Sequence, residues 1–277
     1  MTDTARCYVC GARTRPRQVG ISSMLVCPEC GLGRTVATSQ TGDYWTTHDG
    51  GNREVAGPYW TDARAAVFRG ALALLEAEHG KGRVLDLGGG VGHFAHLALT
   101  AGWDAYSLDI SEVAVAAAAE RIGGSRSLST IPSELEGTCD AVTLWCVVAH
   151  VEDPRAILSE ALRALRPGGR LFLTTPNFRF QAGYATALAR LGRPIDFSAH
   201  DHLLHFTPGS LGRTLEAVGV AAWRLAFVGV TEYFVAEPRM ARWVVPAKRA
   251  WNRGALGATR ARLPYFGSEL QVVGTAP

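Results

Sequence analysis

Long apolar runs are absent from this sequence, and so is a strong charge of either sign. No segment approaches the roughly 18 consecutive apolar residues that cross a bilayer, and no secretory apolar stretch follows Met1. Lys and Arg number 28 against 25 Asp and Glu, which leaves a formal net charge of +3. This balance gives no reason to expect DNA as a partner. We therefore predict a cytoplasmic protein without a transmembrane segment.

The overall composition is that of a globular protein with few cysteines. Hydrophobic residues make up 47% and charged residues 19% of the 277 positions, enough for one large domain and a small one. Four of the six cysteines lie within the first thirty residues, and Cys139 and Cys146 lie in a later apolar segment. Without a secretory signal, metal ligation explains the first four better than disulfides do.

The four early cysteines form two CxxC pairs, Cys7 with Cys10 and Cys27 with Cys30. Each pair presents two thiolates from a tight turn, and the sixteen residues between the pairs suffice for a hairpin that brings them together. Residues 1–36 are therefore predicted to form a zinc ribbon. Because all four ligands are sulfurs, we expect a structural Zn²⁺ whose loss unfolds the ribbon without directly abolishing the chemistry. A redox role for the pairs is the alternative.

The rest of the chain alternates between strand and helix patterns. Residues 37–82 are predicted to form a linker that ends in a helix over about 62–79. The domain predicted over 83–277 is of the α/β class, because such alternation indicates a parallel sheet covered by helices on both faces. The expected strands are 83–87, 104–109, 127–131, 141–146, 170–175 and a closing pair at 222–228 and 269–274. Helices are expected over 113–121, 154–165 and 208–218 and in a basic segment at about 237–262.

A glycine-rich turn follows the first of these strands. Gly88 and Gly90 let the backbone approach a ligand closely, and the helix that follows offers free N–H groups at its N-terminus. Asp86 lies two residues before the first glycine. A carboxylate there can act on the cationic amino-acid end of S-adenosylmethionine, whereas it would repel a pyrophosphate. The turn therefore favours S-adenosylmethionine over a dinucleotide.

The second strand ends at Asp109 and Ile110, about twenty residues beyond the glycines. An acidic side chain at this place accepts hydrogen bonds from both ribose hydroxyls of an adenosine and excludes a 2′-phosphate. Both residues are therefore predicted to bind the cofactor. The alternative is an α/β domain with a glycine turn and an aspartate that caps a helix.

With these motifs in view, residues 83–180 resemble the class I S-adenosylmethionine-dependent methyltransferases. They are similar in particular to the ubiquinone-biosynthesis O-methyltransferase group, which shares the glycine loop, the ribose aspartate, a His-Val-x-Asp-Pro turn and a Leu-x-Pro-Gly-Gly turn, here at 150–154 and 165–169. Segment 201–211 is also like that group. The resemblance implies a Rossmann-like seven-stranded sheet with helices on both faces.

The same resemblance implies methyl transfer to a small-molecule acceptor, such as a natural-product, sugar-nucleotide or lipid-linked intermediate. It places Trp145 and Cys146, at the tip of the fourth strand, beside the methionine part of the cofactor. The region 127–132 departs from the family pattern because it lacks a clear acidic residue. No adenine contact is therefore predicted there.

Histidines are the candidates for a general base, since their pKa suits proton transfer near neutral pH. His150 follows the fourth strand, and His202 and His205 belong to a later cluster. That cluster also holds His200 and is flanked by Asp196 and Asp201. The alternative is that these histidines only brace a turn and a loop. His93, in the helix after the glycine loop, is expected to be a packing or solvent residue.

Two further segments allow more than one interpretation. Tyr44, Trp45 and Tyr59 can line a lid over the cofactor sulfonium through cation–π contacts, or can simply pack the linker onto the domain. The basic segment at 237–262 can lie on a membrane surface as a peripheral contact, although Pro246 and glycines interrupt its apolar face. A lid packed beside the site is the simpler interpretation.

Two other functions fit the same motifs. An RNA base methyltransferase that recognises its substrate through the ribbon is one, although the balanced charge and segment 201–211 make RNA the less favoured partner. A non-enzymatic S-adenosylmethionine-binding zinc protein is the other. The sequence names neither the acceptor nor the atom that is methylated.

Overall fold

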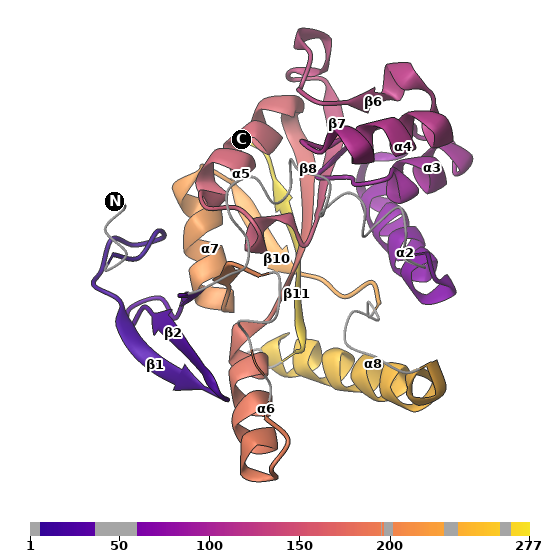
Figure 1. The fold of residues 1–277 in the computed structure, drawn as a ribbon. Helices are drawn as coiled ribbons and strands as arrows, with labels where there is room; N and C mark the ends of the chain where they lie inside the picture. Colours follow the sequence, from indigo (N-terminus) through magenta and orange to yellow (C-terminus); the bar gives the residue numbers. More distant parts are fainter. Residues whose placement is uncertain (1–5, 37–59, 195, 197–201, 230–237, 261–266) are drawn as a thin grey trace.

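The computed structural model describes residues 6–36, 60–194, 196, 202–229, 238–260 and 267–277. Figure 1 shows a central sheet flanked by helices, with the N-terminal strands lying beside α6 (Phe178–Arg190) and α7 (Pro208–Ala217). Among the described residues, no helix is both long and apolar enough to span a membrane.

The main sheet has seven strands in the order β10-β11-β8-β7-β4-β5-β6. Their bounds are β4 (Arg83–Leu87), β5 (Asp104–Leu108), β6 (Ser127–Leu128), β7 (Cys139–Trp145), β8 (Leu165–Pro176), β10 (Ala222–Leu225) and β11 (Glu269–Thr275). Strands β4 to β8 are parallel to one another, whereas β11 runs antiparallel to both β8 and β10. This is the predicted seven-stranded sheet with its closing pair.

Helices cover both faces because the central strands are apolar on both sides. One face packs against α2 (Asp62–His79) and α3 (His93–Thr100), and the other against α5 (Pro154–Ala164) and α7. Along β4, Val84 joins the first layer and Leu85 the second. Three 3-10 turns, η1 (Gly124–Arg126), η2 (Ser133–Leu135) and η3 (Val147–Ala149), and helix α4 (Glu112–Ile122) complete this part.

Side-chain caps set where several helices begin. Thr61, Ser111 and Asp153 each accept a backbone N–H bond at the start of α2, α4 and α5. Asn177 caps α6 in the same way, and this helix had not been predicted. The basic segment forms one helix, α8 (Pro238–Arg260), that continues through Pro246. Buried Asn252 anchors it to the chain before β11, accepting a 2.7 Å bond from the Ser268 N–H.

The N-terminal region forms a second, four-stranded antiparallel sheet in the order β1-β2-β3-β9. Its strands are β1 (Arg15–Val19), β2 (Ser22–Val26), β3 (Gly33–Thr35) and β9 (Leu204–His205). β1 and β2 are the hairpin expected between the cysteine pairs. The fourth strand, β9, comes from a distant part of the chain, so this sheet is built partly from the larger domain.

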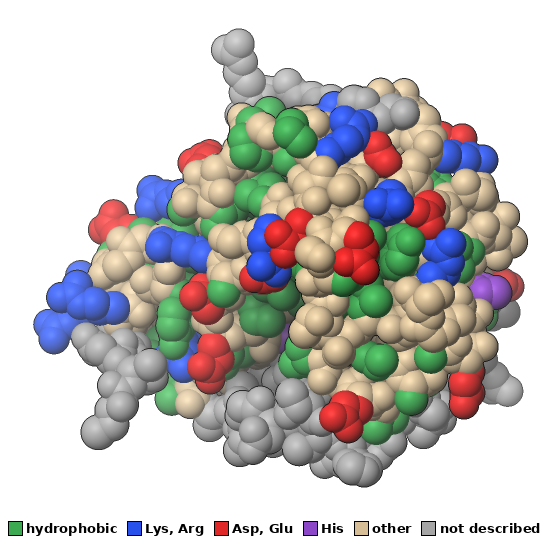
Figure 2. Space-filling model, turned by 90° about the horizontal axis from the view of Figure 1, so that it is seen from above, with side chains coloured by type: hydrophobic (Ala, Val, Ile, Leu, Met, Phe, Trp, Pro, Cys, Tyr) green, Lys and Arg blue, Asp and Glu red, His purple; other side chains and the backbone are tan. Residues whose placement is uncertain are grey.

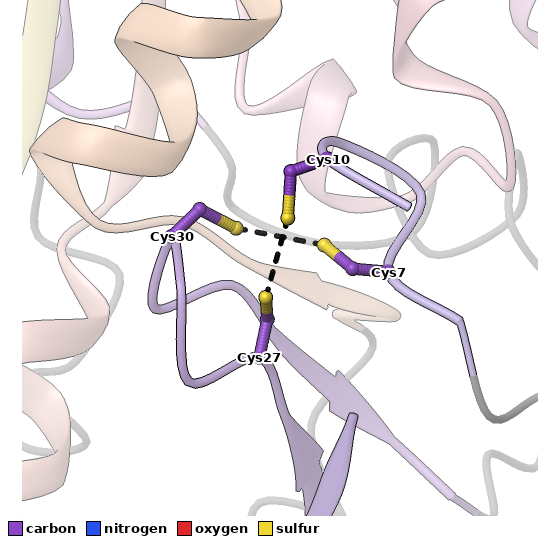
Figure 3. Close-up of side chains that lie close together, drawn as sticks. All are labelled: Cys7, Cys10, Cys27 and Cys30. Atoms are coloured by element: carbon purple, nitrogen blue, oxygen red, sulfur yellow. Dashed lines mark hydrogen bonds between the residues drawn. The ribbon is translucent and has the colours of Figure 1, made fainter. Parts of the chain in front are cut away.

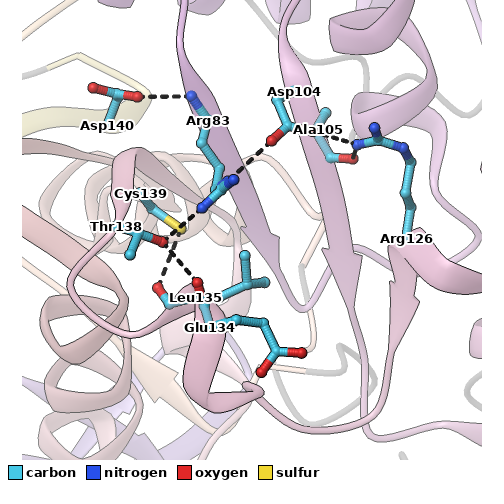
Figure 4. A network of polar contacts seen from close by, with 9 residues as sticks. All are labelled: Arg83, Asp104, Ala105, Arg126, Glu134, Leu135, Thr138, Cys139 and Asp140. Carbon is cyan, nitrogen blue, oxygen red and sulfur yellow. Dashed lines mark hydrogen bonds and ion pairs between the residues drawn. The ribbon is translucent and has the colours of Figure 1, made fainter.

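A charged network lies where β4, β5 and β7 begin (Figure 4). The guanidinium groups of Arg83 and Arg126 donate to Asp104 over 2.9 and 2.6 Å, and the Arg83 backbone N–H donates to Asp140 over 2.7 Å. Figure 2, a view from above, shows acidic and basic side chains next to one another on this side of the molecule. Basic and acidic side chains are interspersed in this view and form no continuous basic surface among the described residues.

Candidate functional site

The glycine loop connects the end of β4 to α3 and crosses the end of β5. The N–H groups of Gly88 and Gly89 both donate to the Leu108 carbonyl, over 2.8 and 3.0 Å. Gly88 has a φ of +74°, and a Cβ atom there would lie 2.5 Å from a Val147 methyl group. Glycine is therefore required at this position by the chain's own packing, in addition to any ligand.

Asp86 lies beneath this loop and is almost fully buried, with 1% of its surface exposed. Its Oδ1 atom accepts a 2.6 Å bond from the Thr143 hydroxyl on the adjacent strand β7. A Cβ atom on Gly89 would lie 3.0 Å from Oδ2 of Asp86. The carboxylate therefore lies close to the loop, with Thr143 as a partner that sequence reasoning missed.

Asp109 lies directly after β5 and is fixed by two backbone groups. Its Oδ2 atom accepts a 2.9 Å bond from the Gly90 N–H, and its Oδ1 atom accepts one of the same length from the Ser111 N–H. Burial raises the pKa of Asp109, and these bonds only partly oppose that effect. The next residue, Ile110, exposes 59% of its surface. An exposed apolar side chain thus lies next to the Asp109 carboxylate, which can accept further hydrogen bonds.

Trp145, at the tip of β7, belongs to an aromatic cluster. Its ring centroid lies 4.5 Å from that of Phe68 and 5.3 Å from those of Phe94 and Phe172. Its Nε1–H group is buried and has no hydrogen-bond partner among the described residues. A buried donor without a partner carries a free-energy cost, so this atom fits a site that receives a polar ligand.

Cys146, His150 and His202 meet just beyond the tip of β7. The Cys146 Sγ atom lies 3.2 Å from Nε2 of His202, and the rings of His150 and His202 have centroids 4.7 Å apart. Cys146 has a φ of +66°, and among the described residues it is the only non-glycine residue with a positive φ. The Leu203 N–H donates to the Ala149 carbonyl over 2.9 Å. The structure therefore brings together two of the three predicted histidines.

Burial raises the pKa of the Cys146 thiol to about 12, and the charge of Glu269 acts in the same direction. Glu269 begins β11 and is itself buried, with 7% exposed. The pKa of Lys248 on α8 is lowered by burial, an effect that Glu269 opposes. Sequence reasoning missed this carboxylate, although an acid opening an apolar closing strand is a signal that can be read.

His205, the third candidate, turns instead toward the N-terminal sheet. It is buried, and its Nε2 atom lies 2.9 Å from the Thr35 hydroxyl on β3. Its ring centroid lies 6.2 Å from that of His202. Asp196, expected beside a histidine, accepts a 2.8 Å bond from Ser22 on β2. His200 and Asp201 lie outside the described residues.

The four N-terminal cysteines point toward one another, as Figure 3 shows. The Sγ atoms of Cys7 and Cys30 are 3.5 Å apart and those of Cys10 and Cys27 are 3.4 Å apart, and all four lie within 4.8 Å of one another. The hydrogen bond from Cys30 lowers the pKa of Cys7 to about 5, despite burial. Four convergent sulfurs fit a tetrahedral zinc ion.

The cysteine region contacts the segment that carries His202. The Thr35 hydroxyl donates to the His202 carbonyl over 3.1 Å, and the Thr207 hydroxyl donates to the Cys30 carbonyl over 2.9 Å. Strand β3 pairs with β9 two residues further on. The predicted ribbon is therefore joined to the candidate site by backbone and side-chain bonds.

His93 lies apart from this cluster and is a packing residue, as expected. It stacks on Trp60 with ring centroids 4.9 Å apart, and its Nδ1 atom lies 3.3 Å from Nη1 of Arg121. Burial and then the charge of Arg121 lower the pKa of His93 to about 4. The aromatic residues considered for a lid, Tyr44, Trp45 and Tyr59, lie outside the described residues.

Residues 59–225 match the sequence model of a family described as a methyltransferase domain. A ubiquinone biosynthesis O-methyltransferase of Xanthomonas oryzae is 34% identical over 116 residues, which are 38% of this chain and 47% of that protein. One of Aromatoleum aromaticum is 27% identical over 148 residues, 50% of this chain and 63% of that protein. The chain thus spans about half the length of these relatives.

Solved structures show a similar fold at low sequence identity. A possible histamine N-methyltransferase of Thermotoga maritima has a TM-score of 0.51 at 15% identity and covers 82% of this chain and 98% of its own. The magnesium protoporphyrin IX methyltransferase of Synechocystis has a TM-score of 0.52 at 18% identity and covers 85% and 97%. Both likenesses concern the fold alone.

Proposed function

Because the chain belongs to the methyltransferase domain family, we propose that it transfers the methyl group of S-adenosylmethionine to a small-molecule acceptor. One observation carries this proposal. Adjacent strand ends hold Asp86 and Asp109 on one side and the pair His150 and His202 on the other. In an open parallel sheet, ligands bind at this carboxyl edge of the strands.

The residues at the ends of β4 and β5 fit the cofactor. Asp109 retains lone pairs for ribose hydroxyls beside the bonds it accepts from Gly90 and Ser111. Exposed Ile110 offers an apolar surface for the adenine ring. Asp86, next to the glycine loop, would attract the cationic amino-acid end of S-adenosylmethionine. Trp145 and Cys146 would adjoin its methionine part. When bound, S-adenosylmethionine supplies a methyl group on a sulfonium, which is already activated for displacement.

The histidines suit an acceptor hydroxyl. His150 and His202 lie at the tip of β7, one strand away from the glycine loop. An imidazole near neutral pH can receive a hydroxyl proton, and holding the acceptor in line accounts for much of the remaining rate. We assign His205 a positioning role, because it is buried against Thr35. We propose an acceptor of the natural-product, sugar-nucleotide or lipid-linked type.

We assign the four N-terminal cysteines to a structural zinc ion. Their sulfurs converge and leave no coordination position for a substrate. The ion would hold β1, β2 and β3 together, and through them the segment at 202–207. Metal analysis tests this assignment, because Cys27→Ser with Cys30→Ser should lose that zinc while Cys139→Ala, which alters a thiol elsewhere, should keep it.

Two measurements together test the proposed function. Calorimetry should show that the protein binds S-adenosylmethionine, and a labelled methyl group should pass to members of a panel of hydroxylated aromatics, sugar nucleotides and lipid-linked sugars, with formation of S-adenosylhomocysteine. Ribosomal RNA fragments belong in the same panel. Transfer to RNA alone would overturn the small-molecule proposal, and tight binding without any conversion would favour a non-enzymatic binding protein.

A further inference from the structure

Cys146, His150 and His202 form a second group of metal-ligating side chains, apart from the ribbon cysteines. One ligand atom from each lies within 4.8 Å of the other two, and the Cys146 Sγ and His202 Nε2 atoms are 3.2 Å apart. In a tetrahedral zinc site, sulfur at about 2.3 Å and nitrogen at about 2.0 Å from the ion lie roughly 3.5 Å from each other. The observed spacing is therefore close to the one that an ion requires.

The backbone holds these three residues in place. Cys146 leaves β7 in the left-handed conformation, with a φ of +66° that a side chain rarely adopts. The bond from the Leu203 N–H to the Ala149 carbonyl joins the segment of His202 to the turn that precedes His150. The Thr35 hydroxyl also donates a hydrogen bond to the His202 carbonyl. The group is thus built by the fold and is not a chance meeting of mobile surface side chains.

The donor set selects the kind of ion. One thiolate and two imidazoles suit zinc and related borderline ions, whereas magnesium and calcium prefer oxygen ligands, which this group lacks. Binding would release the thiol proton to solvent. The thiolate would cancel one of the two positive charges of zinc, so the ligand set itself reduces the charge that is buried.

We propose that Cys146, His150 and His202 bind a second zinc ion, whose open fourth position takes the hydroxyl oxygen of the acceptor. This inference rests on the proposed function for the identity of that fourth ligand. Three protein ligands and one open position are the arrangement of catalytic zinc, in contrast to the closed set of four sulfurs in the ribbon. In this arrangement the imidazoles would serve as ligands in place of the proton-accepting role proposed above, and the ion would make the bound hydroxyl acidic enough to lose its proton to solvent.

X-ray absorption spectroscopy on the whole wild-type chain, loaded with zinc and freed of excess metal, tests the site directly. A ribbon ion alone gives a signal of sulfur ligands only. Two ions give about two zinc per chain and a mean shell that also contains imidazole nitrogen. Cys146→Ser, His150→Ala and His202→Ala should each reduce the content to about one zinc, whereas His96→Ala, a change at an exposed histidine of α3, should leave it at two.

The outcomes separate this inference from the proposed function. An all-sulfur shell in folded wild-type protein overturns the second zinc site, even if methyl transfer to a small molecule is observed. Imidazole nitrogen in that shell, lost in His202→Ala, supports the site even if no acceptor in the panel is methylated. Cobalt substitution gives a second measurement on the wild type, because a site with one thiolate and two imidazoles has a weaker sulfur charge-transfer band than a four-thiolate site.

Discussion

The cofactor side of the site, around Asp109, and the acceptor side, around His202, differ in how far apart in the sequence their contacting residues lie. The cofactor side comes from one stretch, in which the Gly90 N–H and the Asp109 carboxylate are 19 residues apart. The acceptor side joins Cys146 to His202 across 56 residues, and Thr35 to His205 across 170. The first side follows from two neighbouring strands, whereas the second exists only once distant segments have packed.

This difference predicts that the two sides fail separately. A change on the acceptor side should lower turnover and leave cofactor affinity intact, because His202 meets Cys146 at the tip of β7, whereas the Leu108 carbonyl at the end of β5 holds the glycine loop. A change on the cofactor side should do the reverse. Three substitutions test the separation and a fourth, Asp104→Asn, lies away from both sides; they are ordered here by the size of the expected effect.

The largest effect is expected from His202→Ala. Removing this imidazole should lower turnover about 10²- to 10⁴-fold, the range for loss of a group that handles the acceptor proton. Cofactor affinity, measured by calorimetry, should stay within about twofold of wild type. His96→Ala is the matched control and should match wild type in both measurements. Normal turnover in His202→Ala would remove this residue from the chemistry.

A smaller effect, on the other side, is expected from Asp109→Ala. The loss of charge-assisted bonds to the ribose should weaken S-adenosylmethionine binding by about 1.5 to 3 kcal/mol. Asp109→Asn retains one acceptor oxygen and should lose less. Zinc content should not change in either variant. Equal affinity of wild type and Asp109→Ala, with the fold intact by circular dichroism, would show that another residue holds the ribose.

Thr35→Val tests whether the ribbon supports the acceptor side. The substitution preserves shape but leaves buried Nε2 of His205 and the His202 carbonyl without the hydroxyl. Unfolding in urea should show a loss of about 1 to 2 kcal/mol, the usual effect of removing one partner of a buried hydrogen bond. Turnover should fall several-fold while cofactor affinity holds, and Thr35→Ser should restore both. A ribbon independent of the chemistry predicts unchanged turnover in Thr35→Val.

The smallest effect is expected from Asp104→Asn, at the N-terminal end of β5 and so at the opposite end of the strands from the site. Burial tends to raise the pKa of Asp104, but the bonds from Arg126 and Arg83 outweigh it and lower the pKa. Since the group is about one-third exposed, the loss of stability at pH 7 should be below about 1 kcal/mol.

The pH dependence of this loss has a definite sign. A carboxyl with a lowered folded-state pKa stabilises the protein above its unfolded pKa of about 3.9, and the contribution disappears as pH falls through the folded value. Wild type and Asp104→Asn should therefore differ in unfolding free energy at pH 7 and converge in strong acid. A difference that grows on acidification would contradict the assignment.

The same contrast explains how much the sequence allows one to predict. The ends of β4 and β5, the glycine loop and α2 follow from local patterns, and the structure confirms them. Helix α6 was missed, although Asn177 after a proline marks its start. Strand β9 has only two residues and no periodicity, so its pairing with β3 has no local signal. Thr143 was hidden for the same reason, since its partner Asp86 lies on another strand.

The pairing of β3 with β9 also bears on how the chain folds as it is synthesised. Because Thr35 and His205 are 170 residues apart, the nascent ribbon has β3 as an open edge until most of the chain has emerged. Open edges invite pairing with other chains, and a short edge with a charged residue resists it. β3 has only three residues, with Arg34 at its centre. Contacts of such separation form slowly, so the acceptor side is among the last parts of the molecule to be completed.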